Sequence, residues 1–327
     1  MNSLKARLKD ALPYLGYVGF FVTAFFFFAY LTFPYDRLRD YVVAQANSQQ
    51  QEPGKRRELR IGEMSLRPLL GVKLEDVEVR RFDNAGDSDP SVMRADMLKV
   101  SASAWSLLFG NVSYDFEGEV GEGSFEGSYE QDGDEVHISV EFDEVDLATA
   151  GIGSALGFPL EGKLSGEAEL TLPKDAALSE GSINLTIAHL ALGDGKSKLS
   201  APGMRDGLTV ERVNAGTLTL ICEITKGTAT FKKFSTDGKD LTLNGSGNIK
   251  LATPTARSRL NVALQFRFSE AYKSRDDKTK ALFDLMSFRP ELKRATTPDG
   301  ALRFELRGFL GNPRATPAGR SGAARGR

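Results

Sequence analysis

The chain has 327 residues, with 42 Lys and Arg against 44 Asp and Glu and a net charge of −2. This balance gives the protein no net positive field of the kind that attracts nucleic acid, so no nucleic-acid partner is expected. The single cysteine, Cys222, excludes an intramolecular disulfide, so a sizeable apolar core must hold any exported domain.

An uncharged apolar stretch, residues 14–33, lies near the N-terminus and reads YLGYVGFFVTAFFFFAYLTF. A helix of these twenty residues, at about 1.5 Å per residue, spans roughly 30 Å, the thickness of the hydrocarbon core of a bilayer. A cleaved signal peptide has a shorter apolar run and a small-residue cleavage site, and a buried core helix has a polar stripe. Neither pattern is present, and we predict a single transmembrane helix over residues 14–33.

Basic residues flank this predicted helix unequally. Lys5, Arg7 and Lys9 precede it, whereas Arg37 and Arg39 follow it. The positive-inside rule then places residues 1–13 in the cytoplasm as a short tail, and the rest of the chain on the other side of the membrane.

The sequence after the anchor changes character twice. Residues 34–54 predict a helix that resumes after Pro34 and then a linker. From residue 55 to 311, apolar and polar residues alternate with the period of two that half-buried strands show, and turn signals separate the runs. The pattern predicts a mainly β domain whose sheet is long, antiparallel, and curved or folded over, with few short helices.

Two breaks in the alternation predict helices. Ala148–Phe158 is rich in small residues, and Lys278–Phe288 places apolar residues at helical spacing, with Asp276 or Asp277 as the N-cap. The last residues, 312–327, are dominated by Gly, Pro, Ala and Arg, a composition that predicts a disordered tail.

No catalytic or metal-binding constellation is evident in the sequence. His137 and His189 lie in separate strand-like runs. The acidic loop Asp83–Pro90 does not have its glycine at the sixth position of a calcium loop, and no glutamate follows at the twelfth. Cys222 lies in an apolar alternating run, which predicts a buried core residue and not a nucleophile. We therefore expect no enzymatic activity, no cofactor and no metal site.

Four short motifs, taken in order along the chain, carry a resemblance. Phe33-Pro34-Tyr35-Asp36 follows the anchor, Leu160–Leu170 reads LEGKLSGEAEL, Ala229–Leu251 reads ATFKKFSTDGKDLTLNGSGNIKL, and Phe304–Pro313 reads FELRGFLGNP. In this order they resemble the type II secretion system protein N family and the wider AsmA-like envelope proteins. The resemblance implies a Gram-negative inner-membrane protein with residues 55–311 in the periplasm.

The same resemblance implies two alternative functions. The first is a non-enzymatic component of type II protein secretion, whose partners are the inner membrane and other secretion or envelope proteins. The second is AsmA-like binding or transport of phospholipid in an apolar groove. The candidate groove residues come from two predicted strands and are Leu218, Leu220, Ile224, Leu260, Val262, Leu264, Phe266 and Phe268. The same residues would form a core in a closed sandwich, and periodicity leaves both arrangements open.

Overall fold

The computed structural model describes residues 34–48, 51–52, 55–67, 71–82, 90–103, 112–156, 158–196, 198–199, 208–209, 211–288 and 290–318, and the isolated positions 17, 20, 21, 24, 25, 28 and 32. The helices are α2 (Tyr35–Ser48), α4 (Ile152–Leu156), α5 (Glu270–Lys273), α6 (Asp277–Ser287) and α7 (Pro290–Ala295), with the 3₁₀ turns η1 (Ala176–Leu178) and η2 (Thr255–Arg257). The strands are β1 (Gln51–Glu52), β2 (Lys55–Arg67), β3 (Gly71–Phe82), β4 (Ser91–Ala102), β5 (Val112–Val120), β6 (Gly123–Asp132), β7 (Glu135–Asp146), β8 (Leu160–Pro173), β9 (Glu180–Leu192), β10 (Lys198–Leu199), β11 (Leu208–Thr209), β12 (Val213–Thr225), β13 (Thr228–Thr236), β14 (Leu241–Lys250), β15 (Arg259–Phe268), β16 (Leu302–Phe309) and β17 (Asn312–Pro317).

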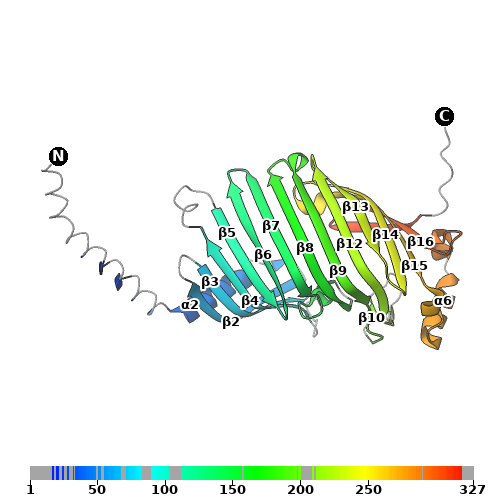
Figure 1. Ribbon diagram of the computed structural model, residues 1–327, viewed down its shortest axis with the longest axis horizontal. Coiled ribbons are helices and arrows are strands. Elements are labelled where there is room, and N and C mark those ends of the chain that lie inside the picture. The colour runs from blue at the N-terminus through cyan, green and yellow to red at the C-terminus, as the bar shows by residue number, and fades with distance from the viewer. Residues whose placement is uncertain are drawn as a thin grey trace.

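One sheet of 15 strands makes up most of the molecule (Figure 1). Its strands follow chain order from β1 to β17, and only the hairpin β10–β11 stands apart, between β9 and β12. Each strand pairs antiparallel with its neighbour in the chain, as β14 does with β15. The prediction of a mainly β, antiparallel fold with few helices is confirmed.

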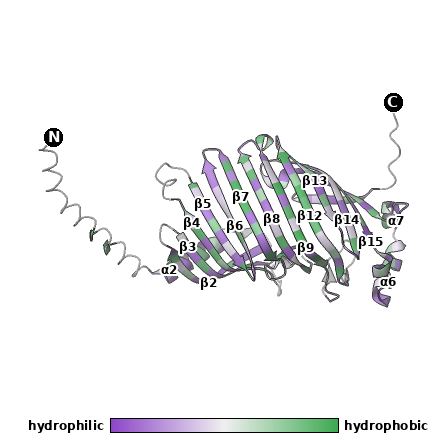
Figure 2. Ribbon diagram, in the orientation of Figure 1, coloured by the Kyte–Doolittle hydropathy of each residue, from purple (hydrophilic) through white to green (hydrophobic). Residues whose placement is uncertain are grey.

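The register places apolar residues of successive strands on one face of this sheet. Ile224, Ala229, Ile249 and Leu260 lie directly opposite one another across β12, β13, β14 and β15. Directly opposed residues of antiparallel strands point to the same face, and side chains alternate along each strand. Each strand therefore has an apolar and a polar face, and Figure 2 shows the underlying alternation of hydrophobic and hydrophilic residues along the strands.

A row of backbone irregularities bends the strands near one end of the sheet. Asp76 in β3, Glu144 in β7 and His189 in β9 have φ angles of 52°, 48° and 55°, in the left-handed region. The register of β7 against β8 also shifts by one residue between Phe142 and Val145. Such bulges kink a strand and increase its twist, so they curve the sheet at this level.

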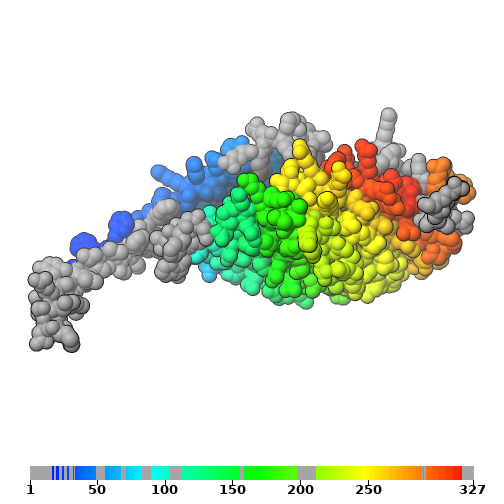
Figure 3. Space-filling view, turned by 90° about the horizontal axis from the view of Figure 1, so that it is seen from above, coloured from blue at the N-terminus to red at the C-terminus, as the bar shows by residue number. Residues whose placement is uncertain are grey.

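The curvature turns the sheet into a trough with an apolar inner face. In Figure 3 the first strands (blue) and the last strands (red) lie on the same side of the central green and yellow strands. Val77 of β3 and Met93 of β4 line one pocket together with Phe125 of β6 and Phe142 of β7. The first strands therefore fold back over the apolar face of the strands that follow them.

Helix α2 is fixed to the second strand. The side-chain amide of Asn47 donates to the carbonyl oxygen of Leu59 at 3.3 Å and accepts from its N–H at 2.7 Å. Arg39 Nη1 donates to the carbonyl oxygen of Gly62 at 2.8 Å. A helix was predicted after Pro34, and these bonds show that it is tied to the sheet.

The predicted membrane anchor, residues 14–33, lies mostly outside the described residues. Its few described positions, among them Phe20 and Phe25, are helical. Among the helices of the described part of the chain, none is long and apolar enough to cross a membrane.

The prediction of a disordered tail from residue 312 is wrong for its first residues. Asn312–Pro317 form β17, which pairs antiparallel with β16 after a turn at Leu310-Gly311. Strand pairing uses backbone N–H and C=O groups, so a composition poor in apolar residues does not prevent it. The Pro residues, which lack an N–H, are tolerated because β17 is an edge strand. The short strand β1, within the predicted linker, extends the sheet in the same way at its other end.

The two predicted helices are present as α4 and α6. The N-cap of α6 is Asp276, whose carboxylate accepts from the N–H of Thr279 at 2.8 Å. The helices α5 and α7 were not predicted; they have 4 and 6 residues, too few to show a helical period.

The turn of residues 237–240 joins β13 to β14, and its Asp240 is bonded to the first residues of β12. The Asp240 carboxylate is 6% exposed, accepts from the N–H of Asn214 at 2.9 Å and lies 2.7 Å from Arg275 Nη2. Burial disfavours the charged form of Asp240, but the bonds from Arg275 and Asn214 outweigh it, so the pKa of this carboxyl lies below its ordinary value.

We predict that Asp240→Asn lowers the free energy of unfolding by about 2 kcal/mol at pH 7, because it leaves Arg275 without its anion. A lowered folded-state pKa stabilises the fold above the unfolded-state pKa of about 3.9, and this contribution is lost as the pH falls through the folded value. The difference between wild type and variant should therefore hold from pH 7 to about 5 and shrink below about 4. Urea titrations across this range measure it.

The matched control is Glu270→Gln. Glu270 forms an ion pair with Lys273, but its side chain is 88% exposed, so its loss should leave stability unchanged. Equal stability of the Asp240→Asn variant and wild type would show that the Asp240 contacts do not stabilise the turn.

Candidate functional site

The apolar inner face of the curved sheet is the largest candidate site; we call it the trough. It runs from β5 to β16, and the register assigns its residues strand by strand. Most of its side chains are half-buried, and Tyr114 is 40% exposed. The central members of the trough are Phe116, Tyr129, Ile138, Val140, Ala168, Leu170, Ile183, Leu185, Leu220, Phe234, Leu264, Phe304 and Leu306.

All eight predicted groove residues lie on this face. Those of β12 and those of β15 are separated by β13 and β14, and the register joins them through Ile224, Ala229, Ile249 and Leu260. The predicted set thus forms one continuous surface. The eight residues are Leu218, Leu220 and Ile224 on β12, and Leu260, Val262, Leu264, Phe266 and Phe268 on β15.

The structure divides these eight residues between core and surface. Ile224 and Val262 are each only 5% exposed, so they are core. Leu218, Phe266 and Phe268 pack against the buried cluster that contains Tyr272. The remaining residues, Leu220, Leu260 and Leu264, are half-buried and line the trough.

Glycines let aromatic rings lie flat on the floor of the trough. A Cβ on Gly118 would lie 2.2 Å from the ring of Phe125, and one on Gly245 would lie 2.2 Å from the ring of Phe234. The rings therefore cover the backbone of the neighbouring strand, where any other residue would push them away. A glycine placed across from an aromatic residue on the next strand is the sequence signal that could have predicted this packing.

An apolar pocket of about 250 Å³ lies at the N-terminal end of the trough. Residues from β3 and β4 face residues from β5 to β8 across it. Its wall also contains Ile152 of α4, and β4 is held to this region because the N–H of Arg94 donates to the carbonyl oxygen of Ala150 at 3.1 Å. The apolar wall residues include Val77, Val79, Val120, Phe125, Phe142 and Leu164.

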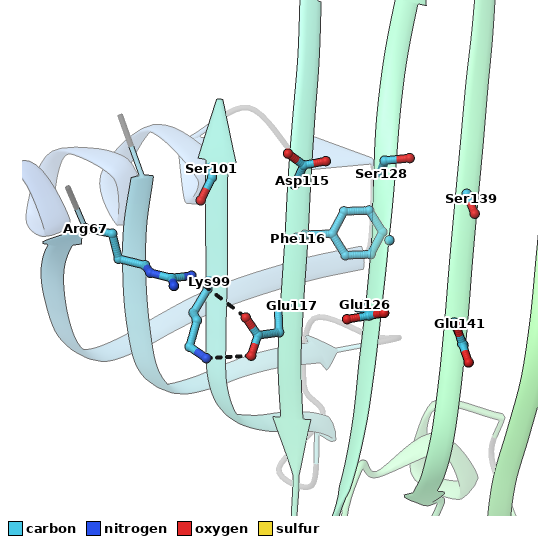
Figure 4. Close-up of a pocket in the computed structure, with 11 residues that line it drawn as sticks. Arg67, Lys99, Ser101, Asp115, Phe116, Glu117, Glu126, Ser128, Ser139 and Glu141 are labelled. Carbon is cyan, nitrogen blue, oxygen red and sulfur yellow. Dashed lines mark hydrogen bonds and ion pairs between the residues drawn. The ribbon is translucent and has the colours of Figure 1, made fainter. Parts of the chain in front are cut away.

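The outer face of the same strands is polar (Figure 4). A depression of about 360 Å³ lies over β4 to β7, where Glu117 contacts Lys99 Nζ at 2.6 Å and Arg67 Nη1 at 3.8 Å. Glu126 and Glu141 follow directly opposite in the next strands. Opposed like charges destabilise a sheet unless water screens them, so this face is exposed to solvent.

Within the residues that the structure describes, no group of three His, Cys, Asp or Glu side chains is arranged to hold a metal ion. His137 lies 3.1 Å from the hydroxyl of Thr171 on the outer face, whereas His189 occupies the bulge of β9. The two histidines are thus not brought together.

Comparison with protein-family models, with curated proteins and with solved structures found no match.

Cys222 offers a probe of how tightly the inner face is packed. It is 3% exposed and packs with Ile224, Ala229 and Phe231, which confirms the prediction of a core position. Burial, and secondarily the charge of Glu223, raises the pKa of its thiol.

We predict that native Cys222 reacts with N-ethylmaleimide about a hundred-fold more slowly than the unfolded chain at pH 7.5, because the thiolate is disfavoured and access is blocked. Mass spectrometry of timed samples measures the rate. The control is Thr230→Cys in a Cys222→Ser background, since Thr230 is exposed on the outer face. Equal rates for the two cysteines would show that the inner face is open at this point.

Proposed function

We propose that the protein is a membrane-anchored, non-enzymatic envelope protein whose trough binds the acyl chains of lipids. The observation that carries this proposal is the continuous apolar inner face of one sheet, many of whose central side chains are only half-buried. A large exposed apolar surface on a folded protein marks a binding site or an aggregation hazard.

The energetics favour an apolar chain as the occupant. Burial of apolar surface stabilises by about 25 cal/mol per Å², or about 0.8 kcal/mol for each CH₂ group. Leu185, Leu220 and Phe234 lie side by side on neighbouring strands and offer carbon surface without charge. Their outer-face neighbours, such as Thr186 and Thr219, keep the opposite side of the sheet hydrated.

The proposed location is the inner membrane, with residues 14–33 as the anchor and the sheet in the periplasm. The helical side chains of Phe20, Phe21 and Phe25 are about 70% exposed, which supports a helix surface that seeks an apolar environment. The bonds from Asn47 and Arg39 tie α2 to β2, so the trough would be held at a fixed position relative to the anchor.

The test is photo-cross-linking of the full chain in its native membrane. We expect that p-benzoylphenylalanine at Leu185, inside the trough, gives a protein with the added mass of a phospholipid. The same group at Thr186, the next residue but on the outer face, should give none. Equal adducts at both positions, or no adduct at Leu185, would contradict the proposal.

A second variant tests whether lipid binding depends on the apolar character of the trough. Leu220→Asp places a carboxylate directly opposite Leu185. An unpaired charge in an apolar site costs about 2 kcal/mol or more, so the lipid adduct at Leu185 should fall by at least about ten-fold. Thr219→Asp, on the outer face, is the matched control and should leave the adduct unchanged.

The component role in type II secretion is a second proposal, and one feature favours it. Among the described strands β17 is the last of the sheet, and its outer edge pairs with no other described strand, so it offers backbone groups to a strand of another protein. Cross-linking at Thr316 of β17 followed by mass spectrometry should then recover an inner-membrane or periplasmic secretion component. Recovery of lipid adducts at Leu185 without any protein adduct at Thr316 would favour lipid binding alone.

A further inference from the structure

A separate pocket of about 360 Å³ lies at the C-terminal end of the trough; we call it the C-terminal pocket. One wall is the sheet, with Phe266 and Phe268 of β15 and Leu302 of β16. The other wall is helical, with Phe283 and Met286 of α6 and Leu292 of α7. Its volume lies within the range of roughly 300–1,000 Å³ that small-molecule sites occupy.

The aromatic wall of this pocket is rigidly built. Phe268 stacks on Tyr272 at 5.6 Å between ring centroids and meets Phe283 edge-on at 5.1 Å. Tyr272 is 2% exposed, and its hydroxyl donates to the carbonyl oxygen of Glu211 at 2.8 Å. Aromatic contacts of this kind are favourable, and they join β15 to α5 and α6 beside the pocket.

The charged residues that line the pocket are both basic. Of the described residues that line the pocket, only Lys273 and Lys293 are charged, and none is Asp or Glu. Lys273 pairs with Glu270 at 2.7 Å, but the Glu270 side chain is 88% exposed, so a ligand anion can replace it at little cost. Within the described part of the chain Lys293 has no recorded ion-pair partner, which leaves its charge available.

We propose that the C-terminal pocket binds a single-chain amphiphile with an anionic head group, the tail between the sheet and α6 and the head at Lys273 and Lys293. This inference rests on the proposed function, since Phe266 and Phe268 belong to the trough as well. It adds that the ligand is recognised by its charge at this end. The lysines lie on the short helices α5 and α7, and both line the pocket.

The experiment labels the full chain in lipid nanodiscs with a dodecyl phosphate that carries a photoreactive diazirine near the end of its tail. Peptide mass spectrometry then maps the label. We expect label on residues of β15, β16, α6 and α7 that line the pocket. Unlabelled dodecyl phosphate should compete, whereas inorganic phosphate, which lacks the tail, and dodecyltrimethylammonium, which carries the opposite charge, should not.

The variants test the head-group site. The double change Lys273→Gln and Lys293→Gln should lower labelling of the pocket about ten-fold, because charge-assisted contacts to the anion are lost. Lys280→Gln, an exposed lysine of α6 outside the pocket, is the matched control. Leu292→Trp should fill the space and abolish labelling while the melting temperature shows that the fold persists.

Each other outcome overturns a defined part of this account. Label confined to β5–β13, with lipid adducts at Leu185, would refute the C-terminal pocket and leave the trough as the lipid site. Label in the pocket that ignores the lysine changes and the head group would refute recognition of an anion. Absence of any competed label, together with no adduct at Leu185, would refute both proposals.

Discussion

The cross-strand register is the constraint on which the rest of the structure depends. Side chains alternate between the two faces of a strand, so a shift of one residue in the pairing register would move every apolar side chain of that strand to the solvent-exposed outer face. Pairs such as Leu220 with Leu185 and Leu264 with Phe304 show that the register keeps apolar side chains on the inner face in successive strands. Backbone hydrogen bonds thus define the apolar surface as a whole.

Two buried clusters form where helices or loops cover the inner face, and a third, around Cys222, lies on β12 and β13. Tyr272 of α5 completes the cluster with Leu160, Leu190 and Leu241 at one level of the strands. Ala150, which precedes α4, packs with Val120 and Val145 nearby. Outside these clusters, inner-face side chains such as Leu185, Leu220 and Leu264 are half-buried, which leaves part of the apolar surface without the burial that stabilises a sandwich. That incomplete burial is what gives the inner face the capacity to bind.

The sequence predicted the strands, their antiparallel pairing and the shared face of the eight groove residues, because a period of two is visible in the chain. It could not separate Ile224 and Val262, which are core, from Leu220 and Leu264, which line the trough. That difference depends on the curvature of the sheet, to which residues far apart in the chain contribute. The C-terminal pocket was missed for a related reason, since Lys273 and Lys293 lie on helices of 4 and 6 residues that leave no periodic signal.

The bend at Asp76 explains a break in the alternation of apolar and polar residues along β3. In β3 the apolar residues are Val72 and Leu74 before Asp76, but Val77 and Val79 after it, so the pattern shifts by one residue. The left-handed conformation of Asp76 inverts the faces at that point, at a cost of about 1–2 kcal/mol for a residue other than glycine. The cost is offset because Val77 and Val79 then face inward and line an apolar pocket with Phe125 and Phe142, whereas an unbroken strand would turn them to water. The left-handed residue at the bend and the one-residue shift in the sequence pattern therefore have the same structural cause. The sheet curves at this point while its apolar side chains stay on the inner face.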